Sequence, residues 1–405
     1  MDLSVQQLML VIITSAAVLA YPLLIKSKRI QTIIQGQIQK WNIRSLSQAK
    51  KCGDVHEPSK IKVSSLFVHP IKSLRPVAVQ SISLTHLGLA YDRSLMLVRP
   101  SGSTGQYRFL TQRQCPPLAT ITASYPVDVE ATVASMGGLS LLPEIETLIK
   151  ITHSSSSKSV HVNISPKAMQ RRTTKLKAGL WSDQVEVVDL GDEAAQFIQS
   201  IILSSNDGDG DGDGDKNNEF EDYTDVRLVA QVPNDNRRVD ARYCPDSVVD
   251  LLGRVPKVSL TDGFPILIVS EESLTQLNHR LTAKGKPAIS MSRFRPNIVV
   301  KGLEKAFGED EWKIIQIGKG GPILHIVKGC PRCKQSCTDQ VTGERFDEPL
   351  ETLKDFREIG GEVYFAQNAL LQPGHIEGKM IRVGDDVRIL SKGDPVWDID
   401  EVQAE

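Results

Sequence analysis

The chain has 405 residues, enough for two or three domains with a sizeable hydrophobic core, which argues against a single small module. Its 48 Lys and Arg residues nearly balance its 49 Asp and Glu residues, so net charge gives no reason to expect nucleic-acid binding. The chain has six cysteines, and Cys52, Cys115 and Cys244 stand apart from the other three, unlike a secreted disulfide framework. We expect reduced thiols in a cytosol-like compartment.

An uncharged apolar segment, "LMLVIITSAAVLAYPLLI", occupies residues 8–25. Its length is close to the minimum that spans the hydrocarbon core of a bilayer, so we expect a transmembrane anchor. The positive charges of Lys26, Lys28 and Arg29 follow the segment, which favours a cytosolic location for the rest of the chain. A cleaved signal or targeting peptide, which normally carries its charge first, is the alternative.

A β-rich domain is expected after a basic, polar tether at residues 26–60. From Ile61, short β-rich runs alternate with turn residues, and further strands are expected around 108–111, 119–123, 159–164 and 185–190. These runs predict a β-barrel or sandwich over residues 61–203. The segment "GDEAAQFIQSII" has an apolar helical face after Asp192, so a helix should close this domain.

An acidic segment rich in Asp and Gly follows at residues 206–222. It cannot bury apolar surface, and we expect a disordered loop. The spacing superficially mimics a calcium-binding loop. However, Asn218 stands where that motif requires a bidentate Glu, and no clear pair of flanking helices is predicted.

A second domain is expected over residues 226–394. "FPILIVS" and "RPNIVVKG" read as strands, and "SEESLTQLNHRL" as a helix capped by Ser270. The strand "GGPILHIVKGC" leads directly into a cysteine cluster, a helix follows in "EPLETLKDFR", and two β-rich segments should close a barrel. The predicted fold class is therefore mainly β with α+β elements.

The cysteine cluster consists of Cys330, Cys333 and Cys337. A structural zinc site would need a fourth ligand such as His325. A redox dithiol would need the start of a helix in a βαβ unit, and an iron–sulfur cluster would need a fourth Cys or an open position. A single thiolate bound to a soft transition metal is the fourth reading. The spacing alone leaves these four readings open.

Five blocks, in order, resemble the MOSC family, in its branch of mitochondrial amidoxime-reducing components: "HPIKS", "YDRSLMLV", "FPILIVSEESLTQLNHRL", "FRPNIVVKG" and "CPRCKQSCTDQVTGERFDEPLETL". The resemblance covers roughly residues 61–392. It implies an N-terminal β-barrel-like domain and a MOSC β-barrel that enclose a molybdenum–molybdopterin cofactor, with a cysteine thiolate as metal ligand. The Arg-Cys of the family's motif falls on Arg332-Cys333.

The resemblance also implies which residues bind the cofactor. Cys333 is the expected metal ligand and catalytic residue, and Asp339 matches an acidic residue near the metal site. Cationic side chains and hydrogen-bond donors suit a molybdopterin with its phosphate and polar rings. The expected cofactor-binding residues are Lys72, Ser73, Arg93, Ser270, Arg295, Asn297 and Arg332. Taken singly, the cations would be surface charges, and Ser270, Asn297 and Asp339 would be turn or helix caps.

The resemblance implies a molybdenum-dependent reductase of small N-hydroxylated compounds such as amidoximes. No dinucleotide-binding glycine fingerprint follows a predicted strand, so electrons should arrive from partners, which the family implies are cytochrome b5 and its NADH-dependent reductase. For the anchored chain, the resemblance implies the mitochondrial outer membrane, with the catalytic domain facing the cytosol. The alternative is a cofactor-binding or sulfur-handling protein, because "KQSCTDQ" resembles the C-terminal MOSC module of molybdenum cofactor sulfurase. With no pyridoxal-phosphate domain in this chain, sulfur would have to come from another protein.

Overall fold

The computed structural model describes residues 59–101, 106–124, 148–154, 156–206, 223–232, 237–374, 376 and 378–398. The predicted anchor, almost all of the tether and almost all of the Asp/Gly segment with its calcium-like spacing lie outside these residues. Within the described ranges, no helix is long and apolar enough to cross a membrane. The anchor therefore stays a prediction.

A closed five-stranded barrel confirms the predicted β-barrel in the N-terminal half of the chain. Around the barrel, the strands follow in the order β10 (Lys175–Leu180), β11 (Asp183–Asp189), β12 (Arg227–Gln231), β5 (Leu95–Ser101) and β6 (Gln106–Phe109). Strand β5 is buried on both faces, because Met96 and Val98 pack in one hydrophobic cluster while Leu95 and Leu97 pack in another. Strand β12 pairs with β11 and β5, so it belongs to this barrel although the sequence places it in the second domain.

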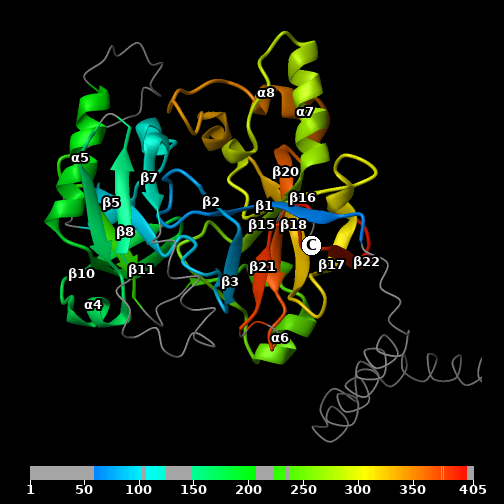
Figure 1. The fold of residues 1–405 in the computed structure, drawn as a ribbon, viewed down its shortest axis with the longest axis horizontal. Helices are drawn as coiled ribbons and strands as arrows, with labels where there is room; N and C mark the ends of the chain where they lie inside the picture. Colours follow the sequence, from blue (N-terminus) through cyan, green and yellow to red (C-terminus); the bar gives the residue numbers. More distant parts are fainter. Residues whose placement is uncertain are drawn as a thin grey trace, which may run out of the picture. The chain divides into compact units, whose positions relative to one another are not determined.

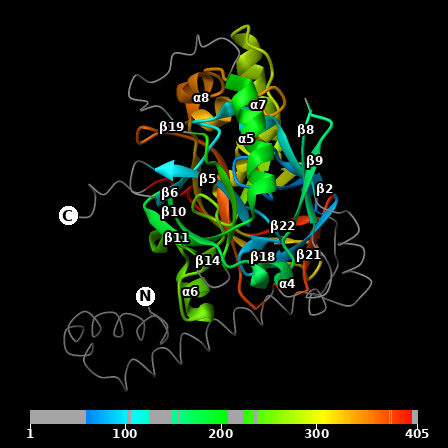
Figure 2. The same ribbon diagram turned by 90° about the vertical axis from the view of Figure 1, so that its left-hand side faces the viewer.

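A helix and a small sheet pack beside the barrel (Figures 1 and 2). Helix α5 (Asp192–Asn206) confirms the predicted apolar face, since Ile198 and Ile202 are fully buried. The neighbouring sheet contains β7 (Ile121–Ser124), β8 (Leu148–His153) and β9 (Ser159–Asn163), and its inward side chains share a hydrophobic cluster with α5. Two short helices complete this part of the chain: η2 (Pro116–Thr120) and α4 (Pro166–Arg171).

The second half of the fold is built on a larger, mostly antiparallel sheet. Its path runs β2 (Val77–Val79), β1 (Lys62–Val68), β16 (Ile298–Lys301), β15 (Ile266–Ser270), β20 (Glu362–Leu371), β18 (Ile323–Pro331), β17 (Trp312–Ile317) and β22 (Val387–Lys392), with β19 (Glu358–Ile359) pairing to β20. Backbone bonds from Val63 N to Asp385 O (2.9 Å) and from Val387 N to Ile61 O (2.8 Å) connect the last strand to β1. Strand β1, predicted within the N-terminal domain, is thus part of this sheet.

Two helices cover one end of this sheet, α7 (Glu271–Ala283) and α8 (Leu350–Arg357), both as predicted (Figure 1). Leu277 of α7 and Leu353 of α8 share a buried cluster with the sheet residue Phe365. The remaining elements are short: β3 (Ser81–Thr85), β4 (Gly88–Leu89), β13 (Arg237–Arg238), η4 (Ala241–Tyr243), α6 (Asp246–Leu252), β14 (Lys257–Val258), η5 (Met291–Phe294), η6 (Gly308–Glu311), η7 (Lys334–Cys337) and β21 (Met380–Arg382).

The C-terminal residues brace β18 just before its cysteines. Gly329 N donates to Val396 O at 2.8 Å, and the Trp397 ring packs on Tyr364 with centroids 4.8 Å apart. Asp398 pairs with Lys328 and accepts a bond from the Tyr364 hydroxyl at 3.0 Å. A Cβ atom on Gly329 would lie 2.5 Å from the Trp397 ring, so this close approach requires glycine.

The variant Gly329→Ala should therefore unfold at lower urea concentration, with a loss of about 1–3 kcal/mol typical of overpacking. Trp397 would have to move, so the tryptophan fluorescence should change as well. Gly179→Ala is the matched control, because its added Cβ would meet the flexible Gln184 side chain at 3.4 Å. An equal loss of stability in both variants would contradict the Trp397 contact as the cause.

Candidate functional site

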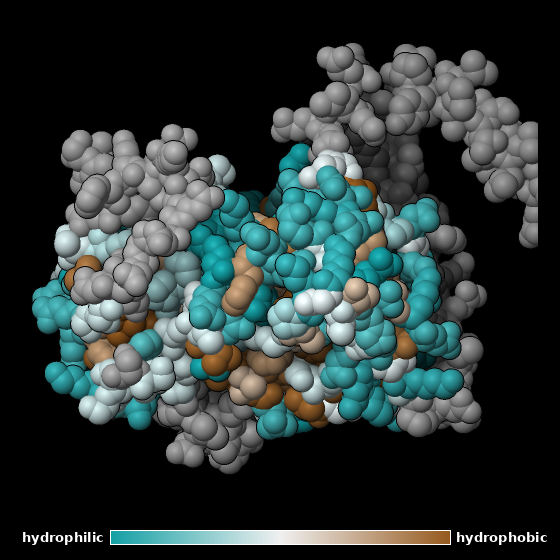
Figure 3. All heavy atoms as spheres, turned by 90° about the horizontal axis from the view of Figure 1, so that it is seen from above, coloured by the Kyte–Doolittle hydropathy of each residue, from teal (hydrophilic) through white to brown (hydrophobic). Residues whose placement is uncertain are grey.

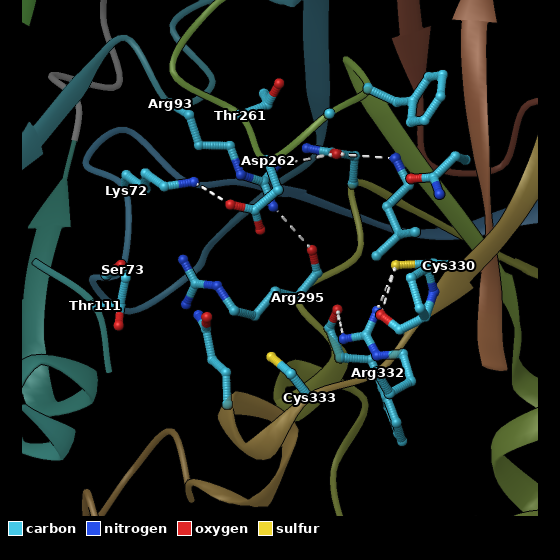
Figure 4. Close-up of a pocket in the computed structure, with 18 of the residues that line it drawn as sticks. Lys72, Ser73, Arg93, Thr111, Thr261, Asp262, Arg295, Cys330, Arg332 and Cys333 are labelled. Atoms are coloured by element: carbon cyan, nitrogen blue, oxygen red, sulfur yellow. Dashed lines mark hydrogen bonds and ion pairs between the residues drawn. The ribbon is translucent and has the colours of Figure 1, made fainter. Parts of the chain in front are cut away.

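A pocket lies where loops from both halves of the fold meet (Figure 4). The loop after β1 contributes Lys72 and Ser73, and the segment between β4 and β5 contributes Arg93. Other parts of the lining come from the approach to β15, the approach to β16, and the end of β18. The described residues that line the pocket are Lys72, Ser73, Arg93, Thr111, Trp181, Thr261, Asp262, Gly263, Phe264, Leu267, Phe294, Arg295, Asn297, Cys330, Pro331, Arg332, Cys333, Gln335 and Asn368.

The pocket is strongly cationic. Its described lining includes four cations and one carboxylate, that of Asp262, which is 68% exposed and pairs with Lys72. Arg93 pairs with Asp92, which is not among the described lining residues. Burial, followed by the nearby charge of Arg93, lowers the pKa of Arg295 to about 9. Burial also lowers the pKa of Lys72, although Asp262 opposes the shift. Both cations are held in surroundings that disfavour their charge, and a bound anion would relieve that cost.

Several pocket residues have left-handed backbone conformations. Ser73, Arg93, Trp181 and Arg295 have φ values of 70°, 45°, 57° and 56°. Positive φ is uncommon for residues other than glycine, because it strains the backbone. Such strained conformations cluster at active sites and ligand-binding sites. Here, residues from distant parts of the chain share this conformation and line one pocket.

Hydrogen bonds fix the orientation of Arg93. Its NH1 atom donates to Asp92 Oδ2 at 2.5 Å and to Asn297 Oδ1 at 3.1 Å, and its NH2 atom donates to the Arg295 carbonyl at 3.2 Å. Asn297 is 1% exposed, and its Oδ1 also accepts from Leu267 N at 3.1 Å. Asn297 therefore supports Arg93 from behind as well as lining the pocket.

The three cysteines of the cluster have different environments. Cys333 is exposed, lines the pocket and lies below the Arg295 side chain in Figure 4. Cys330 also lines the pocket, and Arg332 NH1 contacts its Sγ at 3.0 Å. Cys337 is the last residue of η7 and is buried, and its Sγ contacts the Asp347 carbonyl at 3.3 Å. Burial raises the pKa of Cys330 and that of Cys337, which leaves Cys333 as the accessible pocket thiol.

The positions of the cysteines bear on two of the readings left open by the sequence, a closed zinc site and a single cysteine ligand. The described part of the chain holds no group of three or more His, Cys, Asp or Glu side chains placed to bind a metal ion. His325 pairs with Gln372 at 3.3 Å rather than joining the cysteines. A closed zinc site built from this cluster is therefore not observed among these residues, whereas a single accessible cysteine in a cationic pocket is.

The pocket fits a molybdopterin-type cofactor. Its cations and amide groups suit a phosphate and a polar ring system, and Cys333 supplies one soft donor for a metal held by dithiolene sulfurs. In addition, the buried atoms Thr261 Oγ1 and Arg332 Nε have no hydrogen-bond partner among the described residues. Buried polar groups normally have partners, so these two are free to bind a polar ligand.

Seven of the nine predicted site residues line the pocket: Lys72, Ser73, Arg93, Arg295, Asn297, Arg332 and Cys333. The structure does not bring Ser270 there, because its hydroxyl accepts from Ser273 N to cap α7 and donates to Glu309. Asp339 also lies outside the described lining, because it caps a turn by accepting from Val341 N and Thr342 N and pairs with Arg293.

Several lining residues were not predicted from the sequence. Thr261 and Asp262 belong to "LTDGFP", a turn directly before a buried strand, and that position was a usable signal. Trp181, in the turn between β10 and β11, and Asn368, within β20, carry no comparable local signal. Trp181 is 39% exposed. The face of the molecule seen in Figure 3 is mostly hydrophilic, with a few hydrophobic patches between.

The fold and site define a mainly β protein of two halves, with a cationic pocket that presents one accessible cysteine between them. Residues 60–205 match the MOSC N-terminal beta barrel domain, and residues 255–388 match the MOSC domain. The chain belongs to the MOSC family, which confirms the resemblance seen in its motifs.

Named relatives fall into two groups. The chain is 30% identical to mitochondrial amidoxime reducing component 2 of Bos taurus, over 73% of this chain and 72% of that protein. It is 28% identical to mitochondrial amidoxime-reducing component 1 of Homo sapiens, over 82% and 83%. It is also 26% identical to molybdenum cofactor sulfurase of Aspergillus terreus, over 80% of this chain, but it spans only 40% of that relative's length.

Proposed function

We propose that this protein is a molybdenum-cofactor-dependent reductase of small N-hydroxylated compounds of the amidoxime type. The observation that carries the proposal is a pocket whose described lining includes four cations and one exposed cysteine thiol. The similarity to amidoxime-reducing components over most of both chains supports the same reaction class.

The chain's own residues have distinct roles in this proposal. Cys333 would bind the metal through its thiolate, and metal binding would keep it deprotonated. Lys72, Arg93 and Arg295 would bind the anionic and polar groups of the cofactor, while Arg332 and Thr261 offer their unpaired polar atoms. When bound, the cofactor would supply the two-electron chemistry that removes oxygen from the N-hydroxylated substrate. The protein would orient both reactants and exclude competing water.

We also propose how electrons reach this site. Cytochrome b5 and its NADH-dependent reductase are the proposed donors, and the predicted anchor would hold this chain on the mitochondrial outer membrane with its catalytic domain in the cytosol. The mitochondrial relatives support this location. Attachment of weakly binding redox partners to one membrane would raise their effective concentration.

The proposal is tested by measuring molybdenum and zinc in the purified full chain, together with turnover of benzamidoxime by reduced cytochrome b5. We expect molybdenum near one atom per chain, and turnover. Molybdenum without turnover would favour a cofactor carrier or sulfur-handling protein, and zinc without molybdenum would reject both readings.

The alternative function, sulfur handling, has one observation behind it, the similarity to molybdenum cofactor sulfurase. In that alternative, Cys337 would carry the sulfur. The environment of Cys337 argues against that role, since this thiol is buried, contacts the Asp347 carbonyl and is not among the described residues that line the pocket.

We expect Cys337→Ala to keep benzamidoxime reduction within about threefold of the parent, because the change removes a buried thiol outside the pocket. Its stability should fall by about 1 kcal/mol for the lost packing. The same preparations should be measured for molybdenum content. A loss of turnover at normal molybdenum content and normal stability would contradict this assignment and support sulfur transfer through Cys337.

A further inference from the structure

Two buried glutamines lie directly behind the pocket. Gln112, in the loop after β6, is 0% exposed, and Gln340, in the loop after the cysteine cluster, is 1% exposed. Gln112 Nε2 donates to Gln340 Oε1 at 3.0 Å, and Gln340 Nε2 donates to Gln112 Oε1 at 2.8 Å. The two amides therefore form a reciprocal pair between segments 228 residues apart in sequence. Neither is among the described residues that line the pocket.

The pair connects three loops that build the pocket. Gln112 Nε2 also donates to the Ser73 carbonyl at 2.8 Å, and Gln340 Nε2 also donates to the Thr338 carbonyl at 3.2 Å. Gln340 Oε1 accepts a second bond from Arg295 NH1 at 3.1 Å, and the same NH1 atom donates to the Leu74 carbonyl at 2.7 Å. Ser73 and Arg295 are two of the pocket residues held at positive φ. One bonded group thus restrains both of them and the loop that follows Cys333.

The chemistry of the pair allows one arrangement. All four amide hydrogens are donated, and both amide oxygens accept. If the Gln340 amide were flipped, its NH2 group would face the NH2 group of Gln112 and the guanidinium of Arg295. A buried network that is fully satisfied in one orientation and unsatisfied in the other specifies its geometry strongly. Arg345 adds bonds from its NH2 atom to the Gln112 and Arg113 carbonyls, at 2.8 and 2.7 Å.

We propose that Gln112 and Gln340 are positioning residues, which hold the Arg295 side chain, the Ser73 loop and the loop after Cys333 in a fixed mutual arrangement. Neither touches the reacting groups, and the inference holds whichever reaction the pocket supports. Its distinctive consequence is coupling at a distance: a change at Gln112, in the N-terminal half, should loosen the loop after Cys333, in the C-terminal half.

The test is amide hydrogen exchange of the full chain, resolved by peptide, for Gln112→Leu, Gln340→Leu and the double variant. In Gln112→Leu, exchange in the peptide containing residues 334–343 should be about tenfold faster, the effect of one or two lost hydrogen bonds. In β10, β11 and α7, the exchange rate should change only by the amount that follows from the change in the free energy of global unfolding. Gln199→Leu is the matched control, since Gln199 Nε2 donates to the Thr224 and Val226 carbonyls, away from the pair.

The double variant separates positioning from stability. Replacing both amides leaves neither of them unsatisfied, so its urea midpoint should lie closer to the parent than that of either single variant. The loop should still exchange rapidly, and molybdenum content should fall. Unchanged exchange of residues 334–343 in Gln112→Leu, or slow exchange and full molybdenum content in the double variant, would overturn the proposal. Should the single leucine variants not fold, the exchange of residues 334–343 and the molybdenum content of the double variant decide the same question.

Discussion

Cys333→Ala is expected to lose all reduction of N-hydroxylated substrates and to hold molybdenum less tightly. The physical reason is that Cys333 is the exposed cysteine of the pocket, whereas the other two cysteines of the cluster are more buried, and burial raises their pKa values. Loss of a direct ligand should lower turnover by more than about 100-fold, because even changes behind the ligands of a metal cost about 10–100-fold in metal affinity or activity. Molybdenum per chain and benzamidoxime turnover are the measurements.

Cys330→Ala is the matched control for this prediction. Cys330 lines the same pocket but is half-buried and contacts Arg332 NH1, so its loss should remove a packing contact and leave the metal in place. We expect most of the molybdenum and a reduced but measurable turnover. The ligand assignment fails if Cys333→Ala keeps the parent's turnover, or if Cys330→Ala loses turnover equally.

Local patterns in the sequence were enough to predict the position of Cys333. A buried apolar run ending in "GCPRC" predicts a strand whose end carries the thiols, and β18 ends at Pro331, two residues before Cys333. The Ser270 cap and the apolar face of α5 are equally local, and both are confirmed. Such features depend on neighbouring residues alone, so one sequence is sufficient to find them.

Long-range pairing was not predictable in the same way. Strand β1 pairs with β16, and β12 pairs with β5. In both pairs, one strand lies in the predicted N-terminal domain and the other in the predicted second domain. Nothing in a short β-rich run specifies its partner, since register and partner are set by the fold as a whole. The same limit applies to Trp181 and to the Gln112–Gln340 pair, which gain their roles only when distant loops meet.

Two different predictions were made for Ser270. The helix-capping pattern predicted an N-cap, and the family resemblance predicted a cofactor-binding residue. The hydroxyl of Ser270 caps α7 and bonds to the buried Glu309, so its hydrogen-bonding capacity is already used. Asn297, in contrast, bonds to Arg93 and lines the pocket. Sequence could not separate the two, because both residues are small, polar and adjacent to predicted strands.

Lys72→Met should have opposite effects on cofactor binding and on stability. The Lys72 side chain is 7% exposed, and the loss of its charge should weaken retention of an anionic cofactor by about 10–100-fold, the effect of a charged hydrogen bond worth about 1.5–3 kcal/mol. In the molybdenum-free protein the same change should raise the free energy of unfolding. Burial lowers the pKa of Lys72 even after the contribution of Asp262, so the charged form destabilises the fold.

The pH dependence gives this prediction its sign. Lys72 has a lower pKa in the folded protein than its ordinary value of 10.5, so between those two values the unfolded chain binds more protons. Over that range the parent gains stability as pH rises, whereas Lys72→Met lacks this gain.

The stability advantage of Lys72→Met should therefore be largest near neutral pH and shrink as pH approaches 10.5. Urea unfolding of the two molybdenum-free proteins from pH 7 to 10.5 measures it, and an advantage that grows with pH would mean that Lys72 stabilises the fold through its charge. If a buried cation destabilises the folded protein when no anion is bound, then an anionic ligand that pairs with this cation gains binding free energy by removing that cost.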